Sequence, residues 1–141
     1  MAAGAEARAD ERPAIEAALI ALADSARCPL ILTTGGTGPA RRDVTPEATE
    51  AVCDRLLPGF GERMRFVSLA EVPTAILSRG LSGLAGRTLI VNLPGSTGAV
   101  KDGMAVLSRI LQHAVDQVHG GDHRQAERTG ESGDAASASG G

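Results

Sequence analysis

The sequence has almost no aromatic residues: of its 141 residues only Phe60 and Phe66 are aromatic, and Trp and Tyr are absent. The core must therefore be built from aliphatic side chains, and the aromatic platforms on which single-stranded nucleic acid stacks are missing. The net charge of −3 is slightly acidic, whereas proteins that bind nucleic acid usually present a basic face. We expect no nucleic-acid partner.

Long apolar runs and cysteine motifs are also lacking. No stretch approaches the roughly twenty apolar residues that span a bilayer, and the first ten residues lack the regions of a signal peptide. Cys28 and Cys53 have no metal-binding or redox spacing, so we expect both to be buried as small hydrophobic residues. These absences predict a soluble, cytoplasmic protein of one domain with no membrane partner.

Helical and strand patterns alternate along the middle of the chain. Apolar residues at helical spacing predict helices over about 12–26, 46–57, 61–70 and 99–118, with a short helical turn over 74–79. Apolar runs predict two buried strands, over 29–34 and 88–91. The sequence thus indicates a layered α/β domain over residues 10–119, after a flexible lead, 1–9, and before a disordered tail, 120–141.

Each predicted strand ends in a polar, glycine-bearing loop. Residues 35–38 read Gly-Gly-Thr-Gly, so their bare backbone N–H groups can converge on an anion. Asp43 follows in the same loop, and Thr45-Pro46-Glu47 is typical of a helix start, with Thr45 as its cap. Residues 92–98 form the second loop. Ligands of parallel sheets bind at the carboxyl ends of the strands, so this pattern predicts one crevice for a phosphorylated ligand and a divalent cation.

A glycine-rich turn by itself is often only a tight connection between a strand and a helix. The segment is not the dinucleotide-binding fingerprint, and it lacks the Gly-Lys-Ser or Gly-Lys-Thr ending of a P-loop. The longer context is therefore needed to choose between a structural turn and a ligand-binding loop.

Four segments supply that context: TTGGTGPARRDVTPE at 33–47, PGFGE at 58–62, VPTAILSR at 72–79 and NLPGS at 92–96. Together they resemble the molybdopterin adenylyltransferases, the Mog-type proteins of molybdenum cofactor biosynthesis, over about residues 9–119. The resemblance implies a three-layer molybdopterin-binding-type domain, with a mostly parallel sheet between helices.

The same resemblance bears on the start of the chain. Proteins of this family open with a strand and a helix before the position of Asp10, and here nine residues precede Asp10. We therefore expect the family's N-terminal strand and helix to be lacking.

The resemblance also implies a reaction. The terminal phosphate of molybdopterin attacks the α-phosphorus of ATP, which releases pyrophosphate and leaves adenylyl-molybdopterin; Mg²⁺ is required. The product passes to a molybdate-inserting enzyme, and such proteins are commonly homotrimers. Two alternatives remain: a non-catalytic module that binds molybdopterin or a nucleotide, and the related insertase or competence-damage-type domain, which shares the fold.

Site residues follow from the matched motifs. Asp10 and Asp43 match the family's two carboxylates and are expected to be catalytic and to hold magnesium, although a helix cap for Asp10 and a loop-ordering Asx turn for Asp43 are alternatives. Arg79, beside Ser78, is a weaker candidate for ligand contact, and Lys101 with Asp102 indicates a surface pair. The residues expected to bind substrate or nucleotide are Thr34, Gly35, Gly36, Thr37, Gly38, Ser78, Asn92, Pro94, Gly95 and Ser96.

Overall fold

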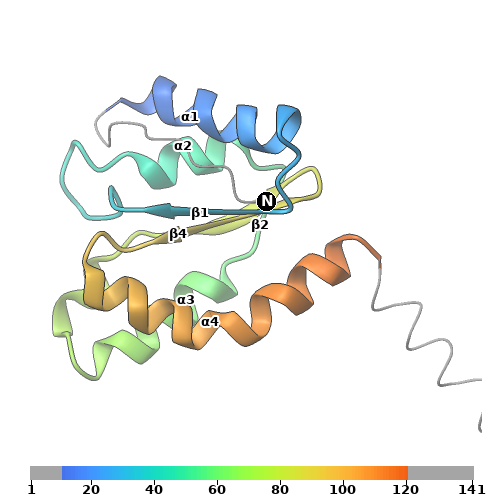
Figure 1. Ribbon diagram of the computed structural model, residues 1–141. Coiled ribbons are helices and arrows are strands. Elements are labelled where there is room, and N and C mark those ends of the chain that lie inside the picture. Colours follow the sequence, from blue (N-terminus) through green and yellow to red (C-terminus); the bar gives the residue numbers. More distant parts are fainter. Residues whose placement is uncertain (1–10, 121–141) are drawn as a thin grey trace, which may run out of the picture.

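The structure, a computed structural model, describes residues 11–120 and arranges them in three layers (Figure 1). Helices α1 (Arg12–Ile20) and α2 (Thr45–Val52) cover one face of a sheet, and α3 (Gly59–Leu69) and α4 (Thr97–Val118) cover the other. The predicted three-layer α/β architecture is confirmed. The predicted flexible lead and all but the first residue of the predicted tail lie outside the described residues.

The sheet is mixed, with the strand order β1-β4-β3-β2. Strands β1 (Leu30–Thr34) and β4 (Thr88–Leu93) are parallel, whereas β3 (Ser82–Ala85) pairs antiparallel with β4 and with β2 (Arg55–Leu56). Only one of the three pairings is therefore parallel, which differs from the mostly parallel sheet that was expected. The reason is the short connection between β3 and β4: a turn at Gly86, where φ is +60°, reverses the chain.

Strands β2 and β3 were not predicted from the sequence. Helix α2 was expected to continue to residue 57, but it ends at Val52 and the chain becomes extended at Cys53. Strand β3 is inconspicuous because it contains small residues, and one of them is required: a Cβ atom at Gly83 would lie 2.5 Å from the Arg55 carbonyl oxygen and 2.8 Å from Cys53 Sγ. Close packing of β2 on β3 therefore depends on glycine here.

The remaining helices follow the predicted pattern more closely. The helix predicted over 12–26 is α1 followed by a π-helical turn, η1 (Ala21–Ser25), in which Ala26 N donates to Ala21 O. The short helical turn predicted near 74–79 is a 3₁₀ helix, η2 (Pro73–Leu77). Among the described residues, no helix combines the length and the apolar character needed to cross a membrane.

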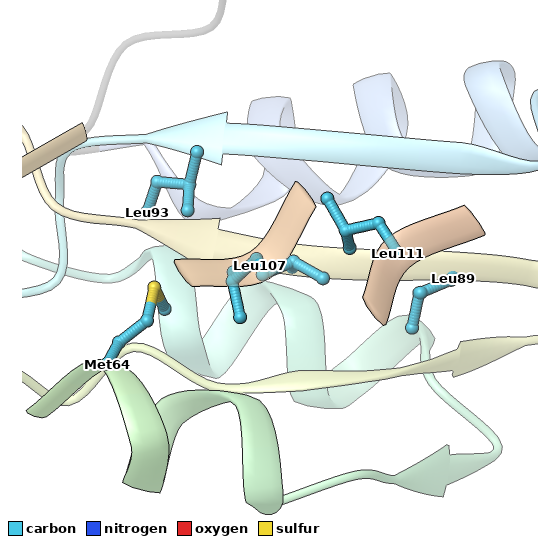
Figure 2. Packing of buried hydrophobic residues seen from close by; sticks show 6 residues of the cluster. Met64, Leu89, Leu93, Leu107 and Leu111 are labelled. Atoms are coloured by element: carbon cyan, nitrogen blue, oxygen red, sulfur yellow. The ribbon is translucent and has the colours of Figure 1, made fainter. Parts of the chain in front are cut away.

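Strand β4 lies at the centre of the core, and all its residues are buried. Alternate side chains point to opposite faces of a strand, so Leu89 and Leu93 pack under α3 and α4 with Met64, Leu107 and Leu111 (Figure 2). Ile90 faces the other layer and packs with Ile15, Leu19, Ile31 and Ala48. Each fully buried aliphatic side chain contributes about 1.5–3 kcal/mol. The core is aliphatic, as the shortage of aromatic residues predicts.

Candidate functional site

The parallel pairing of β1 with β4 brings the two glycine-bearing loops together. The register places Thr34 opposite Leu93, so both strands end at the same edge of the sheet. The ladder continues for one more bond, from Gly35 N to Leu93 O at 3.1 Å. The loops that follow β1 and β4 therefore leave the sheet side by side, as the sequence analysis expected.

The first loop has the backbone conformation that its glycines permit. Gly35 and Gly36 have φ values of +85° and +67°, in the left-handed region that favours glycine. Thr37 is buried, and Gly36 O accepts a hydrogen bond from Thr45 N at 3.2 Å. This bond fixes the loop to the first turn of α2. Thr45 itself is not the cap that was predicted, because Val44 occupies the cap position and no side chain caps the helix.

The side chain of Asp43 is hydrogen-bonded within the glycine-bearing loop. Its Oδ2 atom accepts a hydrogen bond from Ala40 N at 3.1 Å, and a Cβ atom at Gly38 would lie 2.7 Å from the same oxygen. This contact orders the loop, as the alternative for Asp43 expected, but it is not an Asx turn, because the donor lies three residues before Asp43 and not two residues after it. The side chain also lines the cavity described below, so the ordering contact does not remove it from the site.

Arg79 binds the outside of the same loop. Its backbone N donates to Thr37 O at 2.8 Å, its Nε to Gly38 O at 2.8 Å and its Nη2 to Asp43 O at 2.5 Å. Its Nη1 forms an ion pair with Glu47, and this hydrogen bond holds the pKa of the Glu47 carboxyl below its usual value. Arg79 was a weak candidate for ligand contact, but its guanidinium is engaged by the protein and it does not line the cavity.

A cavity of about 950 Å³ lies beside these loops. Its walls are the glycine loop, the loop after β4, one side of α3, the segment around η2 and the first turns of α4. Nine of the predicted site residues line it: Gly35, Gly36, Thr37, Gly38, Asp43, Ser78, Pro94, Gly95 and Ser96.

Three of the predicted site residues are not among those that line the cavity. Asp10 lies outside the described residues. Thr34 is exposed at the end of β1 and is not part of the cavity wall. Asn92 is completely buried, because it lies within β4 and not in the loop that follows.

Asn92 instead connects three segments beneath the loops. Its Nδ2 atom donates to Thr33 Oγ1 at 2.9 Å and to Thr49 Oγ1 at 3.0 Å, and its Oδ1 atom accepts from Leu81 N at 3.2 Å. It thereby joins β1, α2 and the segment before β3. Asn92 was expected to form part of the cavity wall, but it instead supports the two loops from beneath.

Helices α3 and α4 contribute polar residues that the sequence analysis did not assign to the site. Asp102, expected in a surface pair, is exposed but also lines the cavity. The next residue, Gly103, is buried, and a Cβ atom there would lie 3.2 Å from Met64 Sδ, so α3 and α4 approach each other closely beside Asp102. The other polar residues of the wall that were missed are Arg65, Ser68, Glu71 and Thr74.

Within residues 11–120 there is no group of three or more His, Cys, Asp or Glu residues arranged to hold a metal ion. The cysteines are half-buried, not fully buried as expected. Burial raises the pKa of the Cys53 thiol to about 11, with a smaller contribution from the charge of Asp54. Cys53 is therefore a neutral thiol near pH 7 and a poor nucleophile.

Comparison with known proteins decides the family. Residues 3–113 match the sequence profile described as "Probable molybdopterin binding domain". The chain belongs to this family. It is 51% identical over 112 residues to molybdopterin adenylyltransferase of Helicobacter pylori, and 58% identical over 93 residues to that of Escherichia coli K12. These matches cover 79% and 66% of this chain, but only 64% and 48% of the two relatives, so the chain spans about half to two thirds of their length.

Solved structures give the same result for this member of the molybdopterin-binding family. The molybdopterin biosynthesis enzyme MoaB from Thermus thermophilus superposes with a TM-score of 0.73 at 49% identity, covering 79% of this chain and 70% of that one. The molybdopterin biosynthesis Mog protein from Mycobacterium ulcerans has a TM-score of 0.73 at 50% identity, covering 77% and 70%. The family resemblance inferred from the motifs is confirmed.

Proposed function

We propose that this protein transfers the adenylyl group of ATP to molybdopterin in molybdenum cofactor biosynthesis. The observation that supports it most is the meeting of the two loops over one cavity: residues 35–38 provide a wall of backbone, and Pro94, Gly95 and Ser96 provide the wall beside it. Relatives at 51% and 58% identity carry the name of this activity.

The cavity has the size and the mixed character that these substrates require. Pockets for small ligands commonly measure about 300–1,000 Å³ and combine apolar walls with a few polar groups, and this one measures about 950 Å³. Its glycine loop suits phosphate, while Met64, Val67, Val72 and Leu77 offer apolar surface for a ring system. In the proposed reaction, a phosphate oxygen of the pterin forms a bond to the α-phosphorus of ATP as the bond to pyrophosphate breaks.

The residues at the loop fit a magnesium requirement. Mg²⁺ is usually bound by one or two carboxylates together with substrate phosphates, and Asp43 is a carboxylate in the cavity wall. When bound, the cation would neutralise charge on the phosphates. We propose Asp43 and Asp10 as its protein ligands; Asp10 lies outside the described residues.

Activity is tested by incubating the 141-residue chain with ATP, magnesium and molybdopterin, and by measuring pyrophosphate and adenylyl-molybdopterin. Pyrophosphate release that depends on both substrates would support the proposal. Binding of the pterin without any ATP-dependent product would contradict it and would favour a non-catalytic binding module.

We further propose that the protein works in the cytoplasm as a homotrimer and that its product passes to a molybdate-inserting enzyme. The exposed apolar side chains of Phe66 and Ile76, 72% and 69% accessible, provide surface for self-association. The molar mass in solution, measured by light scattering, tests the trimer: a monomeric mass at micromolar concentration would refute it.

A further inference from the structure

Arg79 is the only residue of the segment after η2 whose side chain bonds the glycine loop, among the hydrogen bonds of the described residues. Its guanidinium and backbone N together reach the carbonyl oxygens of Thr37, Gly38 and Asp43 and the carboxylate of Glu47. These partners extend from the middle of the loop to the first turn of α2. One residue therefore connects the middle of the glycine loop, the end of the loop at Asp43 and the first turn of α2.

The position of Arg79 is itself set by α3. Arg65 Nη1 donates to the carbonyl oxygens of Ser78 at 3.3 Å and Gly80 at 3.0 Å, the two residues that flank Arg79. Helix α3 approaches so closely that a Cβ atom at Gly61 would lie 2.7 Å from Gly80 O. The backbone that carries Arg79 is thus held on one side by α3 and on the other by the loop.

We propose that Arg79 is a positioning residue that holds the glycine loop in the shape in which its backbone amides donate hydrogen bonds to a phosphate. Its side chain holds the carbonyl oxygens of Gly38 and Asp43, its backbone N holds that of Thr37, and Arg79 itself does not line the cavity. The side of the loop that faces the cavity is thereby left for an anion. That the ligand is a phosphate rests on the function proposed above. The effect of Arg79 on the shape of the loop does not depend on that function, and it is measured separately.

The geometry distinguishes arginine from lysine. The planar guanidinium presents several donors in a fixed fork, and here Nε, Nη1 and Nη2 each have a different acceptor. A lysine keeps the charge but concentrates its donors at a single atom. Arg79→Lys should therefore behave like Arg79→Gln, whereas a contribution from charge alone would be retained by lysine.

Hydrogen exchange of backbone amides reports on the shape of the loop in the absence of any ligand. The amides of Ala40, Asp43 and Thr45 are hydrogen-bonded within the loop or to it, and the amide of Gly35 belongs to the sheet ladder. In Arg79→Gln and Arg79→Lys we expect the amides of Ala40, Asp43 and Thr45 to exchange about tenfold faster, because local opening of the loop governs their protection. The exchange rate of the Gly35 amide should not change. Arg87→Gln is the matched control, since Arg87 is exposed in the turn after β3 and does not line the cavity.

Binding and turnover give the second measurement on the full chain. We expect the dissociation constant of ATP with magnesium, and its KM, to rise about tenfold in both Arg79 variants with kcat changed much less, the pattern of lost uniform binding. Glu47→Gln removes one charge and keeps an acceptor, so we expect smaller increases in the dissociation constant and KM of ATP. Because glutamine has the shape of glutamate, this variant tests the proposal without a change in side-chain size.

The outcomes separate this inference from the proposed function. Faster loop exchange in the Arg79 variants supports the positioning role even where the wild-type chain forms no adenylyl-molybdopterin, a result that would count against the proposed activity alone. Unchanged exchange at Ala40, Asp43 and Thr45 would overturn the positioning role, as would full retention of ATP affinity in Arg79→Gln. Equal acceleration in Arg87→Gln would also overturn it, because the effect would then not be specific to the loop contact.

Discussion

Gly95 packs directly against Gly35: a Cβ atom at position 95 would lie 3.2 Å from Gly35 Cα. The two residues belong to different loops, 60 positions apart in the sequence, and each loop follows a strand of the parallel β1–β4 pair. This contact sets the separation of the two loops that face the cavity. The gap between the two glycines is too narrow for a methyl group at position 95 unless the loops shift.

Gly95→Ala should push the two loops apart by a few tenths of an ångström, because the added methyl group is closer to Gly35 than ordinary van der Waals contact allows. We expect the affinity for ATP to fall about three- to tenfold, since small displacements at a binding loop weaken oriented contacts, while the melting temperature falls by only a few degrees. Titration calorimetry checks this. Gly59→Ala is the control, because a Cβ atom there meets nothing within 4 Å and Gly59 does not line the cavity; equal losses in both variants would contradict the prediction.

Asn92→Ala should destabilise the whole domain. The substitution leaves the buried Thr49 hydroxyl and the half-buried Thr33 hydroxyl and Leu81 N without the partner that Asn92 provides. An unsatisfied buried polar group costs about 1–3 kcal/mol, so we expect a loss of about 2–4 kcal/mol in the free energy of unfolding by urea denaturation. Thr34→Ala, exposed on β1, is the control and should change stability by less than about 0.5 kcal/mol. An Asn92 variant as stable as wild type would show that the network contributes little.

The Arg79–Glu47 ion pair predicts a pH dependence of stability. Its hydrogen bond lowers the pKa of Glu47 in the folded protein below the ordinary value of 4.5, so the unfolded state takes up this proton first as pH falls. The stabilisation is complete above about pH 4.5 and is lost as pH decreases toward the lower, folded pKa. The effect should be small, because both side chains are more than a third exposed. Denaturation of wild type and Glu47→Gln at several pH values checks this: the stability of the variant should change less than that of wild type as pH falls below about 4.5.

The two carboxylates should differ in their effects. Asp43→Asn keeps an oxygen that can accept from Ala40 N, so the loop retains its shape and only the charge in the cavity wall is removed. We expect it to weaken ligand binding, both of the pterin and of ATP with magnesium, as well as turnover. Asp10→Asn, outside the described residues, should leave pterin binding largely intact while abolishing turnover, because a cation-positioning group acts mainly in the transition state. Equal loss of pterin binding in both variants would disprove this division.

Local patterns accounted for much of the fold and failed where contacts between distant segments decided the structure. The apolar runs before residues 35 and 92 were sufficient to place β1 and β4, and helical spacing was sufficient for α3 and α4. Strand β3 contains Gly83 and other small residues with no strand pattern of its own, and it exists because β4 and β2 pair with it. The early end of α2 has the same origin, since Cys53 and Arg55 turn toward β3.

The sequence by itself determined the family, the glycine loop and nine of the residues that line the cavity, because motifs and glycine conformations are properties of short segments. Only the tertiary structure decided the roles of Asn92 and Arg79. Both were candidates for ligand contact, yet Asn92 is buried between β1 and α2, and Arg79 binds the loop from outside the cavity. Apart from Leu81, their partners lie 32 to 59 positions away in the sequence, and the register of β1 with β4 and the packing of α3 bring them within hydrogen-bonding distance.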